Sequence, residues 1–267
     1  METKMKTTAI VQARINSSRF PKKILKKINN KTILEIIYDR LKKSKYLDDI
    51  VFAIPDHKNE KILKKFLEKK NFRYFIGNTE NLLDRFYKCA KKNKSDFILR
   101  ITSDCPLVDS NMIDEILIKM KKTKVDLITN YSPPTFPDGL DLALFNFKSL
   151  HFAWKHATEK YDKQHVVPFL LKSKKIKKLN ITHSENLSSI RWTLDEPEDL
   201  VVIKNIFKRF KDNNFCWKES LKIIKKYPKE FSANRHIQRN EGSFKGSGQK
   251  LWRKAKNIIP GGTMLYQ

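Results

Sequence analysis

Basic and hydroxyl-bearing side chains gather in one short segment near the N-terminus, which runs from Gln12 to Lys23. It follows an apolar run typical of a β-strand and contains the potential donors Arg14, Ser17, Ser18, Arg19, Lys22 and Lys23. A triphosphate requires several such donors on one stretch, together with backbone N–H groups. Neither the G-x-G-x-x-G pattern nor the Walker P-loop pattern occurs in the sequence. We therefore expect a phosphate-binding loop of another kind, and the alternative is an ordinary solvent-exposed basic loop.

Two aspartates that are far apart in the sequence stand where metal ligands are expected. Asp104 follows the strand-like run DFILRIT, and Asp195 follows IRWTL, which we expect to be a second strand. Nucleotidyl transfer needs a divalent cation, and Mg²⁺ is usually held by one or two carboxylates with waters and phosphate oxygens. The alternative for each aspartate is a helix N-cap, because a carboxylate before a helix accepts hydrogen bonds from free backbone N–H groups.

Other polar residues stand where a ligand could be bound. Arg100 and Ser103 precede the first of these aspartates, and a buried arginine on a sheet needs a partner such as a phosphate. Asp138 and Asp141 enclose a glycine turn, which explains them without any function. His165 precedes an apolar run, where a histidine can equally be a structural hydrogen-bond partner. Each of these candidates therefore has a structural alternative.

The elements that must position these residues follow from the apolar periodicity. Expected strands at 7–11, 49–55, 73–76, 96–102 and 126–130 alternate with expected helices at 32–43, 60–69, 81–92 and 110–121. This alternation predicts an α/β fold with a doubly wound, mostly parallel sheet, whose ligand lies at the carboxyl ends of the strands. After residue 130 the rhythm breaks, which predicts a smaller α+β insertion over 131–187; the run from SSIRWTLD onward should close the sheet. Asp84 and Arg85 are expected as an exposed pair on a helix, and the alternative is a motif position near the nucleotide.

The composition limits the classes of function. The formal charge is +27, from 56 Lys and Arg against 29 Asp and Glu, but the lysines are spread over almost every expected helix face. Because a nucleic-acid footprint requires clustering, a nucleic-acid partner is not expected. There is neither an apolar run of membrane-spanning length nor a signal-peptide pattern, so we expect a cytoplasmic protein without a membrane partner. The three scattered cysteines match no disulfide or zinc spacing.

Six segments carry a resemblance to a known family. They are IVQARINSSRFPKKIL, GNTENLLDRF, RITSDCPLVD, FPDGLD, QHVVPF and RWTLDEPEDL. In this order and spacing the chain resembles cytidylyltransferases of the spore-coat-polysaccharide and CMP-sugar synthetase type, over roughly residues 7–210. The resemblance implies the Rossmann-like fold of the nucleotide-diphospho-sugar transferases. Asn16 and Lys22 stand where relatives commonly have glycine, so the family's lysine corresponds to Lys23.

The resemblance also implies roles for individual residues. Catalytic roles fall to Arg14, Lys23 and Asp104, and Mg²⁺ would be held by Asp104 and Asp195. The acceptor site would include Asp138, Asp141 and His165. The residues implied for nucleotide binding are Gln12, Ala13, Arg14, Ser17, Ser18, Arg19, Lys23, Gly77, Arg100 and Ser103.

The expected reaction is Mg²⁺-dependent transfer of CMP from CTP to a sugar acceptor, with release of pyrophosphate. The acceptor would be an acidic sugar or a sugar or polyol phosphate, and the protein would be a homodimer. A glycosyltransferase of the same fold is one alternative, and a basic nucleic-acid-binding module is an alternative of another class.

The C-terminal end is predicted to lie outside this transferase. We expect a transferase domain over 1–230, a glycine-containing linker over 231–250, and a different segment over 251–267. The last of these, LWRKAKNIIPGGTMLYQ, resembles the start of class III aminotransferases like glutamate-1-semialdehyde aminomutase. A chain ending inside such a motif predicts the front piece of a bifunctional protein, in which pyridoxal phosphate would belong only to the missing domain.

Overall fold

The fold was analysed in a computed structural model, which describes residues 5–239. The strands are β1 (Thr7–Gln12), β2 (Lys27–Ile28), β3 (Lys31–Thr32), β4 (Asp49–Pro55), β5 (Tyr74–Gly77), β6 (Phe97–Thr102), β7 (Leu127–Thr129), β8 (Ala143–Asn146) and β9 (Lys178–Asn180). The α-helices are α1 (Ile33–Leu41), α2 (Lys61–Lys69), α3 (Leu82–Lys92), α4 (Ser110–Lys122), α5 (Phe147–His156), α6 (Lys160–His165), α7 (Val167–Lys172), α8 (Pro197–Lys208) and α9 (Trp217–Lys226). Three 3-10 turns complete the set: η1 (Lys23–Leu25), η2 (Lys58–Glu60) and η3 (Pro228–Phe231).

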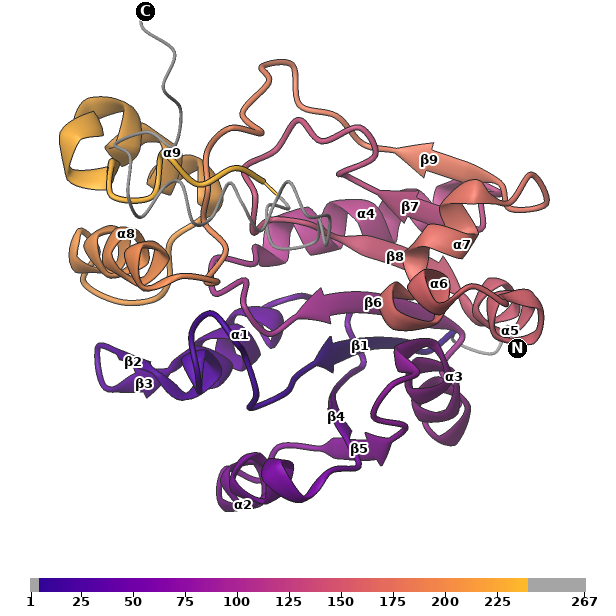
Figure 1. Cartoon of the computed structure of the whole chain (residues 1–267). Helices are drawn as coiled ribbons and strands as arrows, with labels where there is room; N and C mark the ends of the chain where they lie inside the picture. The colour runs from indigo at the N-terminus through magenta and orange to yellow at the C-terminus, as the bar shows by residue number, and fades with distance from the viewer. Residues whose placement is uncertain (1–4, 240–267) are drawn as a thin grey trace, which may run out of the picture.

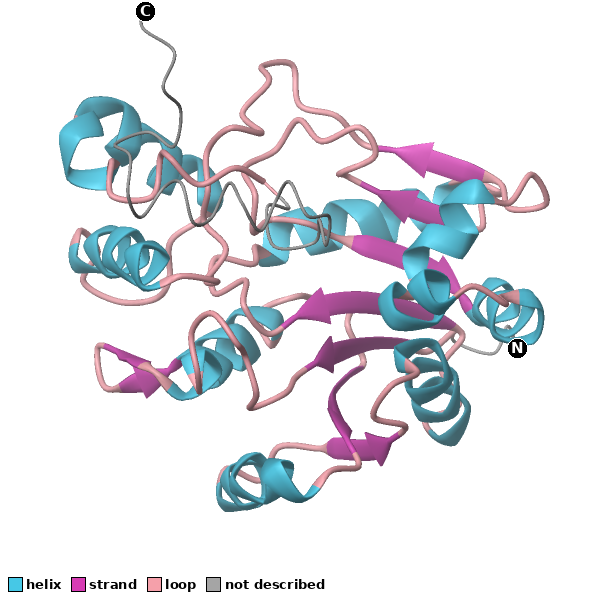
Figure 2. Ribbon diagram, in the orientation of Figure 1, coloured by secondary structure: helices cyan, strands magenta, loops and turns pink. Residues whose placement is uncertain are grey.

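A single sheet of seven strands, in the order β5-β4-β1-β6-β8-β7-β9, runs through the middle of the molecule (Figure 2). All its pairings are parallel except the two that β8 makes with β6 and β7. The register places Gln12 opposite Thr102, and Pro55 opposite Gly77. The loops that follow β1, β4, β5 and β6 therefore leave the same edge of the sheet, where an α/β fold binds its ligand.

Helices cover both faces of the sheet, as expected for a doubly wound fold. Along β1, Ala9 and Val11 belong to one apolar core, together with residues of α1, α2, α4, α8 and α9. Ile10 belongs to a second core with residues of α3, α5 and α7. Figure 1 shows α3 and α5 on the other side of the sheet from α1 and α8. Because both faces are covered, the central strands are mostly apolar instead of alternating regularly with polar residues.

Local sequence signals place the first helices correctly. Thr32 and Glu35 form the predicted capping box at the start of α1, because the threonine accepts from the Glu35 N–H and the glutamate accepts from the Thr32 N–H. Asn81 caps α3 in the same way, by accepting from the Asp84 N–H at 2.9 Å. These caps fix where each helix begins and hence where the preceding loop must end.

The structure corrects one prediction for the second half of the chain. The sequence predicts a strand over IRWTL, but this segment forms only an isolated bridge between Arg191 and Asp138. The edge of the sheet is instead β9, which pairs with β7. The segment 131–187 contains both helices and strands, and its strands β8 and β9 lie in the main sheet.

The start of the predicted linker is also corrected. Residues 231–239 pack on the transferase domain: Phe231 is buried, and Asn234 donates to the Arg191 carbonyl and to the Asp199 carboxylate. The rest of the predicted linker and the aminotransferase-like segment lie outside the described residues. Within the described range, no helix is both long and apolar enough to cross a membrane.

Candidate active site

The basic loop after β1 is folded back on itself and anchored to its neighbours. The backbone N–H of Ile15 donates to both carboxylate oxygens of the buried Glu60, at 3.1 and 2.9 Å. The Phe20 N–H donates to the Ser17 hydroxyl, and the left-handed Lys22 donates its N–H to the Ile15 carbonyl. These bonds end the loop at η1 and send the next side chain, that of Lys23, toward the carboxyl ends of the strands.

Lys23 joins the two aspartates that the sequence predicts as metal ligands. Its Nζ lies 2.9 Å from Asp104 Oδ2 and 2.6 Å from Asp195 Oδ1. The lysine side chain is only 11% exposed. Burial acts to lower the pKa of Lys23, but the two carboxylates outweigh it and raise that pKa. Burial likewise acts to raise the pKa of Asp104, and Lys23 holds it at about 2. Lys23 and Asp104 are therefore both charged at neutral pH.

Neither aspartate serves as the helix cap that was its structural alternative. The N-cap of α4 is Asp109, which accepts from the Asn111 and Met112 N–H groups. At the start of α8 the accepting carboxylate is that of Asp199, which binds the N–H groups of Asp195 and Glu196 at 2.8 Å. The side chains of Asp104 and Asp195 are thus left for the site.

Two arginines surround Asp195. Arg19 Nη2 lies 3.0 Å from Asp195 Oδ2, and its Nη1 donates to Glu196 at 3.1 Å. Arg191 Nη2 lies 3.5 Å from the same Asp195 oxygen and is mainly bound to the fully buried Asp199. Arg19 and Arg191 therefore contact one oxygen of the Asp195 carboxylate, and Lys23 contacts the other.

The Asp138–Asp141 turn is pressed against the segment that carries Asp195. Gly139 has φ +103°, and a Cβ atom there would lie 2.6 Å from the Trp192 carbonyl carbon, so only glycine fits. Backbone bonds link Asp138 to Ile190 and to Trp192 on either side. The turn has a structural role, which was the alternative that the sequence left open. The carboxylates of Asp138 and Asp141 also face the cleft.

Both carboxylates of this turn have arginine partners. Asp138 Oδ2 lies 3.2 Å from Arg191 Nη1, and Asp141 is bonded to Arg239 Nη2. Burial raises the pKa of Asp138 to about 6, with Asp141 and Asp195 adding to the rise against the two arginines. Burial also raises the pKa of Asp141 in spite of Arg239.

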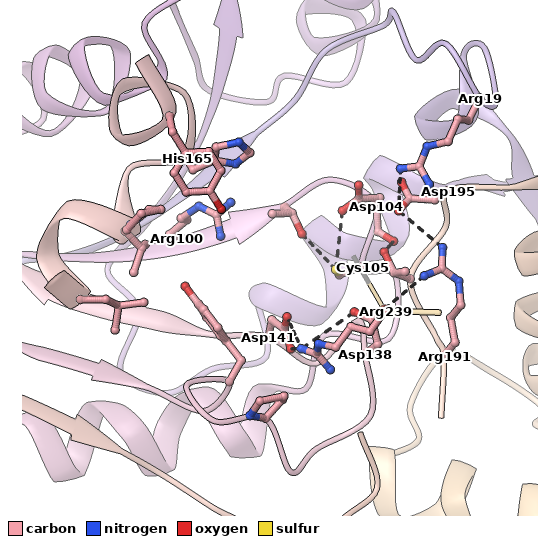
Figure 3. A pocket seen from close by; sticks show the side chains of 18 of the residues that line it. Arg19, Arg100, Asp104, Cys105, Asp138, Asp141, His165, Arg191, Asp195 and Arg239 are labelled. Carbon is pink, nitrogen blue, oxygen red and sulfur yellow. Dashed lines mark hydrogen bonds and ion pairs between the residues drawn. The ribbon is translucent and has the colours of Figure 1, made fainter. Parts of the chain in front are cut away.

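These groups line one cleft of about 830 Å³ (Figure 3). Asp104, Asp195 and Arg19 lie on one side of it, and Arg100 and His165 lie on the other. Arg100 donates to Gln12 Oε1 at 3.1 Å, which ties the ends of β1 and β6 together. Sequence-predicted nucleotide, metal and acceptor residues thus meet in a single cavity.

Other predicted nucleotide-binding residues lie elsewhere. Arg14, Ser17 and Ser18 line a second cavity of about 780 Å³, on the side of the loop that faces η2 and α2. Gly77 ends β5, where a Cβ atom would lie 2.9 Å from the Arg85 side chain. Arg85 itself is buried and donates to the Asn78 carbonyl. The basic loop therefore has one face on each cavity.

The predicted surface pair on α3 is wrong. Asp84 and Arg85 are 7% and 5% exposed, and they contact different partners. Asp84 accepts from the indole N–H of Trp154 and pairs with Lys88. Two adjacent positions in the sequence could not show that the side chains have separate partners. Consecutive residues of a helix point about 100° apart, so each side chain meets a different part of the fold.

The family assignment can be made from the sequence match as a whole. A family model described as cytidylyltransferase matches residues 8–230. The chain belongs to the cytidylyltransferase family. Its match to an uncharacterized protein of Methanocaldococcus jannaschii is 32% identical over 237 residues and covers 88% of this chain and 96% of that protein. The predicted aminotransferase-like tail lies beyond the range of the family model.

Two relatives with named roles match over a shorter range. The chain is 35% identical over 112 residues to the spore coat polysaccharide biosynthesis protein SpsF of Bacillus subtilis, covering 40% of this chain and 47% of that protein. It is 31% identical over 113 residues to a 3-deoxy-manno-octulosonate cytidylyltransferase of Geotalea daltonii, covering 42% of this chain and 44% of that protein. Both matches span less than half of the relative's length.

Solved structures agree with the cytidylyltransferase fold. A cytidylyltransferase from Leptospira borgpetersenii superposes with a TM-score of 0.81 at 28% identity, covering 85% of this chain and 97% of that one. A CMP-2-keto-3-deoxy-manno-octonic acid synthetase complexed with CTP superposes with a TM-score of 0.58 at 15% identity, covering 76% of this chain and 99% of that one. This superposition shows that the two proteins share a fold.

Several residues that line the two cavities escaped the sequence-based prediction. Arg191 stands in one of the quoted motifs, and its position four residues before Asp195 was a usable signal. Arg239 gave no signal, because it lies in a polar stretch that reads as linker. Lys58 and Lys61, which line the second cavity beside Arg14, are not distinguishable in the sequence from the many other lysines.

The carboxylate pair fits a magnesium ion by its chemistry. Asp104 and Asp195 offer hard oxygen donors that converge on one point, now marked by Lys23 Nζ. Among residues 5–239, no group of three or more His, Cys, Asp or Glu side chains could hold a metal ion. Two protein carboxylates suit Mg²⁺, which commonly takes its remaining ligands from phosphate and water.

Proposed function

We propose that this protein transfers CMP from CTP to an acidic sugar or to a sugar or polyol phosphate that enters a surface polysaccharide. The observation that carries the proposal is the convergence of Lys23, Asp104 and Asp195 at the carboxyl edge of the sheet. The family membership supports cytidylyl transfer. The names of the SpsF and octulosonate cytidylyltransferase relatives support a sugar acceptor and a polysaccharide product.

In the proposed reaction an acceptor oxygen attacks the α-phosphorus of CTP in line with the leaving group. One P–O bond forms to the acceptor, the bond between the α-phosphorus and the bridging oxygen breaks, and pyrophosphate leaves with that oxygen. Charge accumulates on the phosphate oxygens, so catalysis depends on placing cations around them. Lys23 and Arg19 are held at the centre by Asp104, Asp195 and Glu196.

Asp104 and Asp195 are the residues proposed to hold Mg²⁺, which when bound would neutralise charge on the phosphate oxygens. Arg14 and Ser17, on the other face of the same loop, are proposed to bind the β- and γ-phosphates with Ser18. Lys23 Nζ would then leave that point to the cation and contact phosphate oxygens beside it. Asp138, Asp141 and His165 line the rest of the cleft and are proposed to contact the acceptor.

Nucleotide selectivity tests the proposal directly. A ligand that binds only the native state raises the melting temperature. We expect CTP with Mg²⁺ to raise the Tm of the wild type more than UTP, GTP or ATP at equal concentration. The shift should be smaller without Mg²⁺ and in Asp104→Asn. Equal shifts for all four nucleotides, or a CTP shift that is unchanged in Asp104→Asn with Mg²⁺, would contradict the proposed site.

A further inference from the structure

The C-terminal segment (residues 232–239) reaches into the cleft although it lies beyond the range that the family model matches. The family match ends at residue 230, whereas Arg239 lines the same cavity as Asp104 and Asp195. Figure 3 shows its guanidinium beside Asp141 and Asp138. The cleft is therefore lined in part by a side chain from beyond the range of the family model.

The segment is held firmly enough to position that side chain. Asn234 is 3% exposed and donates to the Arg191 carbonyl at 3.0 Å and to Asp199 Oδ1 at 2.9 Å. Asp199 is the same buried carboxylate that binds Arg191 and the N–H of Asp195. The segment is therefore tied to the backbone that presents Asp195, so Arg239 approaches the cleft from a fixed base.

Arg239 has donors left over after its ion pairs. Its Nη2 binds Asp141 and lies 4.0 Å from Asp138 Oδ1, while its Nη1 is buried and has no hydrogen-bond partner. The whole side chain is only 16% exposed. A buried donor without a partner has lost its hydration without gaining a hydrogen bond, so the site favours a ligand group that accepts from it.

A second arginine in the cleft, Arg100, has donors that no carboxylate of the described residues binds. Arg100 donates to Gln12 and, within residues 5–239, forms no ion pair. It lines the same cavity as Arg239 and lies beside Tyr131, whose pKa burial raises to about 12 against the opposing effect of Arg100. Two guanidinium groups with spare donors on one cavity suit an oxyanion, because a pair of carboxylate or phosphate oxygens matches the arginine fork.

We propose that Arg239 binds an anionic group of the acceptor, a carboxylate or a phosphate, and thereby sets acceptor specificity. The proposal rests on the proposed function, because it assigns the acceptor end of that cleft. Arg239 is a specificity residue here, and it leaves the binding of CTP to the loop after β1. Asp141 orients the guanidinium and Arg100 is the second donor.

The test uses the full chain saturated with CTP and Mg²⁺, so that the phosphate-binding loop is occupied. Three probes are titrated while the Tm is followed: 3-deoxy-manno-octulosonate as the carboxylate, ribose 5-phosphate as the phosphate, and ribose as the neutral control. We expect at least one acid to stabilise the wild type and ribose to have no effect. In Arg239→Ala the apparent affinity for that acid should fall at least about tenfold, as for loss of charge-assisted hydrogen bonds.

Two further variants keep the test decisive. Arg235→Ala is the matched control, because this exposed arginine of the same segment donates to the Pro228 carbonyl and does not line the cleft. It should bind the acid as the wild type does. Arg239→Lys keeps a charge near Asp141 but loses the fork, and it should bind the acid more weakly than the wild type even if Arg239→Ala fails to fold.

The outcomes separate the two proposals. Suppose first that CTP raises the Tm of the wild type. The role of Arg239 is then wrong, and the proposed function stands, if neither acid raises the Tm or if ribose raises it equally well. The same holds if the lysine variant keeps full affinity for the acid. If CTP itself has no effect, the proposed function fails.

Discussion

At the level of single side chains, Lys23 is the residue on which the site depends. It is nearly buried, and it keeps two carboxylates within 2.9 Å of one ammonium group. Removing one partner of a buried ion pair leaves an uncompensated charge. Substitutions at these three positions therefore test electrostatics as well as chemistry, and each needs a control for folding.

Asp104→Asn should fold and lose most of its turnover. The substitution keeps the size of the side chain but removes a charge proposed to hold Mg²⁺, and we expect kcat to fall by roughly a hundredfold or more. Pyrophosphate release from CTP with the best acceptor of the panel is the measurement. Asp195→Asn should behave similarly. Asp212→Asn, an exposed aspartate between α8 and α9, is the control. Wild-type release by Asp104→Asn at limiting Mg²⁺ would contradict the assignment.

Lys23→Ala should weaken binding of CTP far more than binding of CMP. Its proposed contacts are to phosphate oxygens that CMP lacks, and a charged hydrogen bond contributes roughly 1.5–3 kcal/mol. Calorimetric titration of both nucleotides into wild type, Lys23→Ala and the exposed control Lys27→Ala measures the difference. An equal loss of affinity for both nucleotides would remove Lys23 from this role.

The sequence predicted most of these side chains, because short motifs carry both residue type and local conformation. Arg19, Lys23, Asp104 and Asp195 were all expected in the site and do meet there. What the sequence could not show is that Lys23 would lie between the two aspartates, since the three residues are 81 and 172 positions apart. The parallel pairing of β1 and β6 brings Lys23 near Asp104, and the hydrogen bond from the Leu194 N–H to the Asp104 carbonyl places Asp195 beside them.

At the level of elements, the turn at Gly139 is the tightest contact between separate parts of the site. It lies against the Trp192 backbone and fixes both Asp138 and the segment that leads to Asp195. That segment is extended and hydrogen-bonded, but its isolated bridge does not make it a strand. Its β-like composition gave a strand prediction because local pattern cannot show whether a partner strand is available.

Gly139→Ala should destabilise the fold more than Gly77→Ala. At Gly139 the added Cβ meets backbone atoms at 2.6–2.8 Å and the backbone lies at φ +103°. At Gly77 the nearest atoms belong to side chains, at 2.9 Å, and these can shift. We expect urea unfolding to show a loss above about 1 kcal/mol for the first variant and a smaller loss for the second. The reverse order would show that the turn is not constrained as described.

The C-terminal segment illustrates a limit of sequence-based boundaries. Its polar composition predicts a linker, yet Asn234 is buried against Arg191 and Asp199. By composition an asparagine suggests a linker because it is polar. In the folded chain, however, this side-chain amide forms hydrogen bonds with buried polar groups that come together only on folding. The predicted first helices, by contrast, were placed well, since their capping residues are local signals.

For the whole molecule, the burial of acidic groups in the cleft should appear in the pH dependence of stability. The pKa of Asp138 is raised from 3.8 to about 6, mainly by burial. Between about pH 4 and 6 the folded protein therefore holds a proton that the unfolded chain has released, so this group makes stability fall as pH rises through that window.

Asp138→Asn removes this titration. Relative to the wild type, the variant's free energy of unfolding should improve by up to about 3 kcal/mol between pH 4 and pH 7, because one pKa unit corresponds to about 1.4 kcal/mol. Urea unfolding at several pH values measures the difference between the two proteins, which cancels the titration of other groups. A difference that is independent of pH would show that Asp138 titrates normally.

The central claim is that CTP and a divalent cation meet at the Lys23, Asp104 and Asp195 cluster. A crystal structure with CTP and Mn²⁺ in place of Mg²⁺ tests it most directly, because the anomalous signal of manganese locates the ion independently of the nucleotide. We predict a manganese peak coordinated by carboxylate oxygens of Asp104 and Asp195, with the triphosphate contacting Lys23 and the loop after β1. A nucleotide bound away from this cluster, or a manganese ion bound without either aspartate, would contradict the account.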